Sequence, residues 1–95
     1  TRVFALVGAD GSGGYAEYAV AQATSVVPLP DHLSSDIASG ILVAGTTAVL
    51  ALETVAAVQP GDLVLIEAAG GGVGVLSIQL AVLAGATVLG SASSE

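Results

Sequence analysis

Three small residues, Ala69, Gly71 and Gly74, stand at a spacing that suits the binding of a phosphate group. In the frame Ala-x-Gly-x-x-Gly, the first position allows a tight turn and the second lets the backbone approach a pyrophosphate. The third lets a helix pack closely on a strand. The N–H groups at the start of that helix would face the anion. The sequence therefore predicts a dinucleotide-binding turn; the alternative is a tight turn that binds no ligand.

A nucleoside triphosphate is excluded as the ligand of this turn. Its binding loop needs a Lys and a Ser or Thr after the last glycine. The chain contains no Lys, and Arg2 is its single basic residue.

The residues that follow the next predicted strand indicate which dinucleotide would bind. NAD sites usually carry an acid about twenty residues after the glycine turn, where it binds the ribose 2′-hydroxyl. That position falls near Ala92 and holds no acid, whereas hydroxyls at Ser91, Ser93 and Ser94 could bind a 2′-phosphate. This favours NADPH over NADH. The alternative is that these serines are ordinary loop residues.

The elements that must position these residues can be read from the hydrophobic pattern. Residues 63–68 (LVLIEA) suit a buried strand, although Glu67 would then be a costly buried carboxylate. Residues 73–83 have helical spacing, and residues 87–89 begin another strand. The last third of the chain therefore predicts one βαβ unit with a parallel crossover.

The first two thirds predict a mixture of strands and helix. Residues 2–7 and 15–20 suit short strands, and residues 25–30 suit an extended segment. Ser34 and Ser35 offer a helix N-cap, and a helical region should run to about Val58 with a break near Gly45. The predicted fold class is α/β.

Composition excludes several classes of function. One basic residue against eight acids, a net charge of −7, argues against binding nucleic acid or an anionic membrane surface. Residues 37–58 are apolar enough to span a membrane, but Gly40, Gly45 and their Val and Ala content favour a buried helix. There is no Cys, and His32 alone cannot form a zinc site, so no metal is expected.

Several short motifs together resemble the zinc-independent quinone oxidoreductases of the medium-chain dehydrogenase/reductase superfamily. In chain order these are GGYAEY (13–18), VPLP (27–30), GTTA (45–48), QPGD (59–62), AAGGGVG (68–74), LAGATVLG (83–90) and SSE (93–95). The resemblance implies an internal segment of a longer enzyme. It would hold the end of a GroES-like catalytic domain (1–33), connecting helices (34–60) and the first βαβ of a Rossmann domain (61–95).

The resemblance also implies roles for individual residues. Ala69, Gly71, Gly72, Val73 and Gly74 would contact the NADPH pyrophosphate, and Thr47 would lie beside the nicotinamide. Ser91, Ser93 and Ser94 would occupy the 2′-phosphate loop. No catalytic acid, base or nucleophile is assigned.

The function implied is hydride transfer from NADPH to a quinone or enone in a cytoplasmic, homodimeric enzyme, with the isolated 95 residues inactive alone. One alternative is the enoyl reductase module of a polyketide or fatty acid synthase. Others are a noncatalytic NADPH-binding or structural protein and an inactive fragment.

Overall fold

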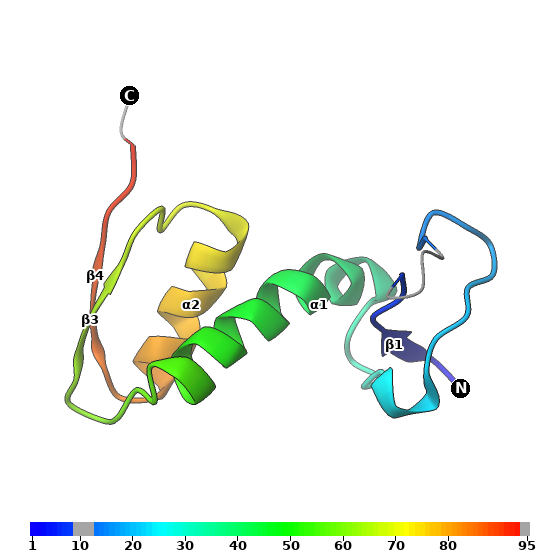
Figure 1. Cartoon of the computed structure of the whole chain (residues 1–95), viewed down its shortest axis with the longest axis horizontal. Coiled ribbons are helices and arrows are strands. Elements are labelled where there is room, and N and C mark those ends of the chain that lie inside the picture. Colours follow the sequence, from blue (N-terminus) through cyan, green and yellow to red (C-terminus); the bar gives the residue numbers. More distant parts are fainter. Residues whose placement is uncertain (9–12, 94–95) are drawn as a thin grey trace. The chain divides into compact units, whose positions relative to one another are not determined.

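The structure is a computed structural model that describes residues 1–8 and 13–93. Contacts within the chain divide it into two compact units, Thr1–Val43 and Ala44–Glu95 (Figure 1). Each unit contains its own two-stranded sheet. The mixture of helices and strands confirms the predicted α/β class.

In the first unit, two short strands pair antiparallel. Strand β1 (Val3–Ala5) lies beside β2 (Val26–Pro28), which follows a 3-10 turn, η1 (Ala23–Ser25). The Leu29 N–H donates to the Arg2 carbonyl (2.9 Å), which extends the pairing by one step beyond β2. Leu29 is buried, and Ala38 of the following helix is the other buried apolar residue of this unit among those described.

The prediction of a strand over residues 15–20 was wrong. This segment forms a series of bends, and Tyr15 and Tyr18 are almost fully exposed. The alternation of bulky and small side chains suits a strand, but a strand also needs a partner for its backbone N–H and C=O groups. In the described part of the chain no strand lies beside this segment.

Helix α1 (Ser35–Val49) begins as predicted at a serine cap. The Ile37 N–H donates to the Ser34 hydroxyl (3.3 Å), and the Ala38 N–H donates to the Ser34 carbonyl (3.0 Å). The Arg2 guanidinium donates to the Leu33 carbonyl (2.7 Å) and to the Ser35 hydroxyl (3.3 Å). The Ser34 cap and the two hydrogen bonds from Arg2, the residue before β1, therefore fix the start of α1.

We expect Ser34→Ala to destabilise α1 by about 1 kcal/mol, because the Ile37 N–H loses its acceptor. The free energy of unfolding, measured by chemical denaturation with circular dichroism, checks this value. Ser34→Asp is the matched control, since a carboxylate can also cap a helix and should leave the stability nearly unchanged. Equal losses in both variants would contradict the cap.

The predicted break near Gly45 was also wrong. Helix α1 passes through Gly45 and continues into a π-helical turn, η2 (Leu50–Val55), where the Ala56 N–H donates to the Ala51 carbonyl five residues back. A glycine inside a helix costs only about 1 kcal/mol, which packing can offset. A Cβ on Gly45 would lie 3.9 Å from Leu76 Cδ1, so this glycine has a packing neighbour.

The helical stretch Ser35–Val55 is the one candidate for a membrane span in the described part of the chain, by length and composition alone. Buried helices of soluble proteins meet the same test. Only 17% of its most apolar window is buried, so within the described chain the helix lacks the burial that was predicted for residues 37–58.

The second unit contains the predicted βαβ arrangement. Strands β3 (Leu63–Ile66) and β4 (Thr87–Gly90) are parallel, with Leu63 opposite Thr87 and Ile66 opposite Gly90. Helix α2 (Gly72–Leu83) connects them and packs against both strands. Two further hydrogen bonds close the unit at its base, from the Gly61 N–H to the Gly85 carbonyl (2.9 Å) and from the Thr87 N–H to the Asp62 carbonyl (2.8 Å).

Strand β3 is shorter than predicted, and this removes the buried-carboxylate problem at Glu67. The strand ends at Ile66, so Glu67 lies in the following turn and is exposed. An exposed carboxylate keeps its hydration and pays no desolvation cost.

Candidate functional site

The turn between β3 and α2 is tight and has no side-chain cap. Ala68 adopts a left-handed backbone (φ 53°), and the Gly71 N–H donates to the Ala68 carbonyl (2.9 Å). Gly71 is the N-cap of α2, and no side chain accepts a hydrogen bond from the helix start there. The leading N–H groups of a helix lack partners within the helix and carry its positive dipole end. The start of α2 is therefore chemically suited to an anion.

Gly74 is the position where helix α2 lies closest against the backbone of the turn. A Cβ there would lie 2.4 Å from the Ala68 carbonyl oxygen and 2.8 Å from the Ala69 Cα. Both are backbone atoms, which cannot turn aside as a flexible side chain can. Gly74 thus has the third role of the predicted frame, the close packing of the helix. A Cβ on Gly71 would lie 3.2 Å from the Ala68 carbonyl oxygen, whereas Gly72 has open space.

The glycine turn is tied directly to the residues that follow β4. The Ser91 N–H donates to the Ile66 carbonyl (3.0 Å), and the Ser91 carbonyl accepts from the Ala69 N–H (2.8 Å). In a regular parallel ladder one residue bonds two partners that are two positions apart. Here the partners are three apart, so one extra residue bulges out where Ala68 turns left-handed. Ser91 therefore holds both ends of the bulge.

A hollow of about 600 Å³ opens beside this contact. Its lining comes from the two loops at the carboxyl ends of the strands: Ala68, Gly70, Gly71, Ser91, Ala92 and Ser93. The structure thus brings Gly71, Ser91 and Ser93 of the predicted site together, and none of the described lining residues is charged. Ser94 lies outside the described residues. Gly70 and Ala92 also line the hollow and were not predicted.

A second hollow, of about 560 Å³, also lies against the turn, within the same unit. Gly72, Val73 and Gly74 line it together with the π-helical turn, at Ala51 and Leu52. Ser77 also lines it and is 6% exposed. Sequence reasoning missed Ser77, although Gly74, Ser77 and Ala81 recur at helical spacing and share the buried side of α2.

Thr47 stands apart from the other predicted residues. It lies in α1, it is exposed, and it does not line either hollow beside the glycine turn. Ala69 lies in the turn, and its side chain is buried, so its backbone rather than its side chain can face a ligand.

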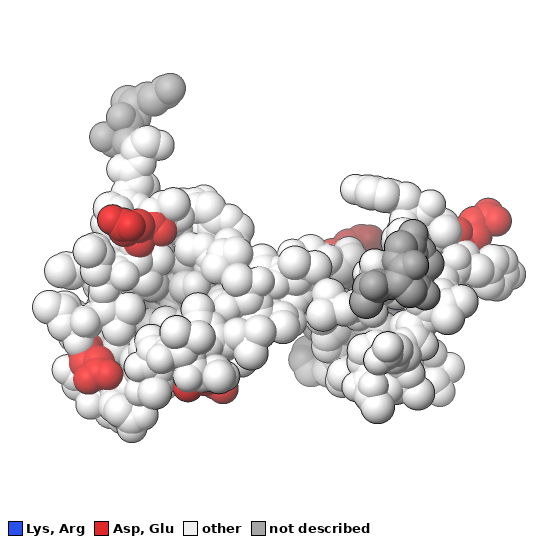
Figure 2. All heavy atoms as spheres, viewed as in Figure 1, with Lys and Arg blue, Asp and Glu red and all other residues white. Residues whose placement is uncertain are grey.

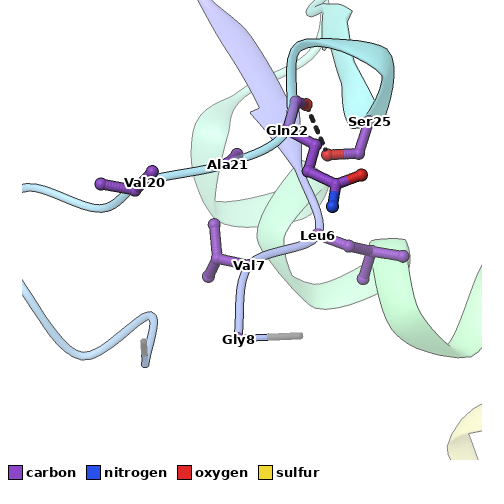
Figure 3. A pocket seen from close by; sticks show the side chains of 7 residues that line it. All are labelled: Leu6, Val7, Gly8, Val20, Ala21, Gln22 and Ser25. Carbon is purple, nitrogen blue, oxygen red and sulfur yellow. Dashed lines mark hydrogen bonds between the residues drawn. The ribbon is translucent and has the colours of Figure 1, made fainter. Parts of the chain in front are cut away.

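A hollow of about 310 Å³ in the first unit was not predicted (Figure 3). It is lined mainly by apolar residues, including Leu6, Val7 and Val20. Its polar groups are partly satisfied, because the Ser25 hydroxyl donates to the Gln22 carbonyl (2.8 Å). Its described lining holds no acid, base or nucleophile pair.

The charged side chains that the structure describes do not gather into a site. Figure 2 shows acidic residues as separate patches on the face in view. Among residues 1–8 and 13–93, no three His, Asp or Glu gather closely enough to hold a metal ion.

Comparison with known proteins decides the family. No protein-family profile matches the chain. The quinone oxidoreductase of Sus scrofa is 45% identical over 84 residues, which is 88% of this chain and 26% of that protein. The Thermus thermophilus quinone oxidoreductase, solved alone and in complex with NADPH, superposes with a TM-score of 0.79 at 39% identity. The superposition covers 86% of this chain and 28% of that one.

The chain belongs to the medium-chain dehydrogenase/reductase superfamily. It spans about a quarter of the length of these quinone oxidoreductases. Another relative is the lovastatin diketide synthase lovF of Aspergillus terreus, 45% identical over 94 residues. That match covers 99% of this chain and 4% of the synthase. Segments similar to this chain thus occur both in quinone oxidoreductases and in a diketide synthase.

Proposed function

We propose that this chain forms part of an NADPH-dependent reductase that transfers hydride to the conjugated carbonyl of a quinone or enone. The observation that carries the proposal is the uncapped start of α2, with Gly74 pressed against the backbone of Ala68 and Ala69. An added side chain at Gly74 would force the helix away, so the close approach depends on glycine. The NADPH complex of the Thermus thermophilus relative supports this choice of cofactor.

The arrangement of domains follows from the same proposal. Residues 1–33 would form the end of a GroES-like catalytic domain, and residues 61–95 would form the start of a Rossmann domain. Residues 34–60 would form the helices that connect these two domains. The parallel pair β3 and β4 with its crossover helix supports the last of these. We further propose a cytoplasmic homodimer that acts on a small molecule, and the charge of −7 supports the absence of a nucleic-acid partner.

The residues of the glycine turn fit the cofactor by shape and charge. The start of α2, at Gly72 and Val73, would receive the pyrophosphate through its backbone N–H groups. Ser91 and Ser93 line a hollow whose described lining holds no charged residue, and their hydroxyls would donate to a 2′-phosphate. We assign Ser94 to the same loop and Thr47 to the nicotinamide end. Bound NADPH would supply the hydride, and the protein would hold and orient it.

We expect the chain to bind NADPH more tightly than NADH, by about tenfold or more, because a charged phosphate strengthens hydrogen bonds from hydroxyl donors. Isothermal titration calorimetry with each cofactor measures both dissociation constants. Ser91→Ala/Ser93→Ala should bring the two constants together without changing the NADH value. If neither cofactor binds the folded chain, the turn between strand and helix binds no ligand and the proposal fails.

An enoyl reductase module of a polyketide synthase is the second candidate. It is favoured by the match to lovastatin diketide synthase, which extends over 99% of this chain. The two candidates differ in the acceptor. The complete protein, supplied with NADPH, should reduce either quinones or enoyl thioesters faster, and the ratio of kcat/KM for the two acceptors decides between them.

A further inference from the structure

Ala69 in the glycine turn lies against Gly90, the last residue of β4. Gly90 is followed by Ser91, Ala92 and Ser93 (the serine loop), which line the hollow beside the glycine turn. A Cβ on Gly90 would lie 2.9 Å from the Ala69 Cβ, which is closer than carbon atoms of two side chains approach in folded proteins. Ala69 is 8% exposed and cannot move its methyl group by rotation, since an alanine side chain has no χ1 heavy atom. There is room for one methyl group in this contact and not for two.

The same two residues flank the bulge that Ser91 holds. Ala69 donates its N–H to the Ser91 carbonyl, and Gly90 immediately precedes Ser91 and pairs with Ile66. If the distance between Ala69 and Gly90 changes, the position of Ser91 and of the hydroxyls that follow it therefore changes as well. The start of α2 has further contacts of its own, which are the Gly71 N–H bond to the Ala68 carbonyl and the close approach of Gly74 to Ala68 and Ala69.

We propose that Ala69 and Gly90 are a size-matched pair of positioning residues that sets the distance between the glycine turn and the serine loop, and thereby the preference for a 2′-phosphorylated cofactor. The inference rests on the proposed function, because it assigns the serine loop to that phosphate. NADH lacks the phosphate and depends mainly on the glycine turn. A displaced serine loop should therefore weaken NADPH binding far more than NADH binding.

The test moves the methyl group from one side of the contact to the other. Gly90→Ala places two methyl groups in the space for one. The double variant Ala69→Gly/Gly90→Ala restores a single methyl group. Ala69→Gly alone removes the methyl group from the contact. It adds no atoms, so steric crowding cannot prevent this variant from folding. Gly40→Ala is the control for a glycine replaced elsewhere, because a Cβ on Gly40 meets nothing within 4 Å.

Two measurements are made on the full chain. Amide hydrogen exchange at Ala69 and Ser91 reports the contact itself and needs no cofactor. Titration calorimetry with NADPH and with NADH reports the cofactor preference. We expect Gly90→Ala to speed exchange at both amides and to weaken NADPH binding by about tenfold or more, with a change of less than about threefold for NADH. The double variant should return exchange at both amides, and the ratio of the NADPH and NADH dissociation constants, close to the values of the unmodified chain.

Other outcomes separate the pair from the proposed function. If the unmodified chain binds NADPH but Gly90→Ala weakens both cofactors equally, the pair does not set the preference. If Gly90→Ala does not fold, Ala69→Gly decides, since unchanged exchange and an unchanged cofactor ratio in that variant would overturn the inference. If the unmodified chain binds neither cofactor, the proposed function fails, and the assignment of a cofactor preference to this pair fails with it.

Discussion

Gly74→Ala should destabilise the second unit by about 3 kcal/mol and abolish NADPH binding. The new Cβ would have to occupy a position 2.4 Å from the Ala68 carbonyl oxygen and 2.9 Å from the Ala69 carbonyl oxygen. Inserting a methyl group into a well-packed site costs about 1–3 kcal/mol, and rigid backbone neighbours place this case at the upper end. Chemical denaturation measures the stability, and titration calorimetry measures the binding.

Gly72→Ala is the matched control for the stability measurement. It lies on the same turn, but a Cβ there meets nothing within 4 Å. Its free energy of unfolding should fall by less than about 0.5 kcal/mol, as for an ordinary surface substitution. If Gly74→Ala were as well tolerated as Gly72→Ala, the close packing of α2 on the turn would be wrong.

Gly85→Ala should have the second-largest effect, a loss of about 2–3 kcal/mol. Gly85 has φ +88°, a conformation that costs a residue with a Cβ about 1–2 kcal/mol. In addition, the new Cβ would lie 3.1 Å from Pro60 Cβ and 3.2 Å from Pro60 Cα. Gly85 also accepts the hydrogen bond from Gly61 that closes the base of the βαβ unit. Chemical denaturation gives the free energy of unfolding.

Gly61→Ala separates the two causes. Gly61 has almost the same backbone conformation (φ +90°), but a Cβ there meets nothing within 4 Å. Gly61→Ala should therefore lose only the backbone contribution, about 1–2 kcal/mol. The difference between the two variants measures the crowding against Pro60. Equal losses would mean that Pro60 yields at no cost.

The βαβ unit could be predicted from the sequence because its signals are local. A compact apolar run, a glycine cluster and a helical spacing succeed one another over residues 63–83, and each is decided by neighbours along the chain. The serine cap at Ser34 is equally local, and it was predicted correctly.

Two other predictions failed because they depend on contacts distant in the sequence. Residues 15–20 have the alternation of a strand, but among the described residues no strand pairs with them. Gly45 suggested a helix break, yet it lies close to Leu76, and the helix instead changes its hydrogen bonding further on, at Leu50–Val55. Side-chain pattern alone gives no account of either outcome.

Some features of the candidate site could likewise be predicted from the sequence, and others could not. The spacing of Ala69, Gly71 and Gly74 is visible in the sequence, and so are the serines. The bulge held by Ser91 is not, because it depends on how many residues of one strand face one residue of the other. The Ala69–Gly90 contact could not be predicted either, since it joins the glycine turn to the end of β4, 21 positions away in the sequence (90 − 69).

The π-helical turn Leu50–Val55 gives the long helix one place where its length can change. Such a turn holds about one residue more than the α-helix would need for the same advance along the axis. Deleting one residue there would restore α-helical hydrogen bonding, and the residues on either side would keep nearly the same facing. The same deletion in the regular part of α1 would instead rotate one side of the helix by about 100° relative to the other. We therefore expect related chains to gain or lose a residue within Leu50–Val55 more readily than in the rest of the helix.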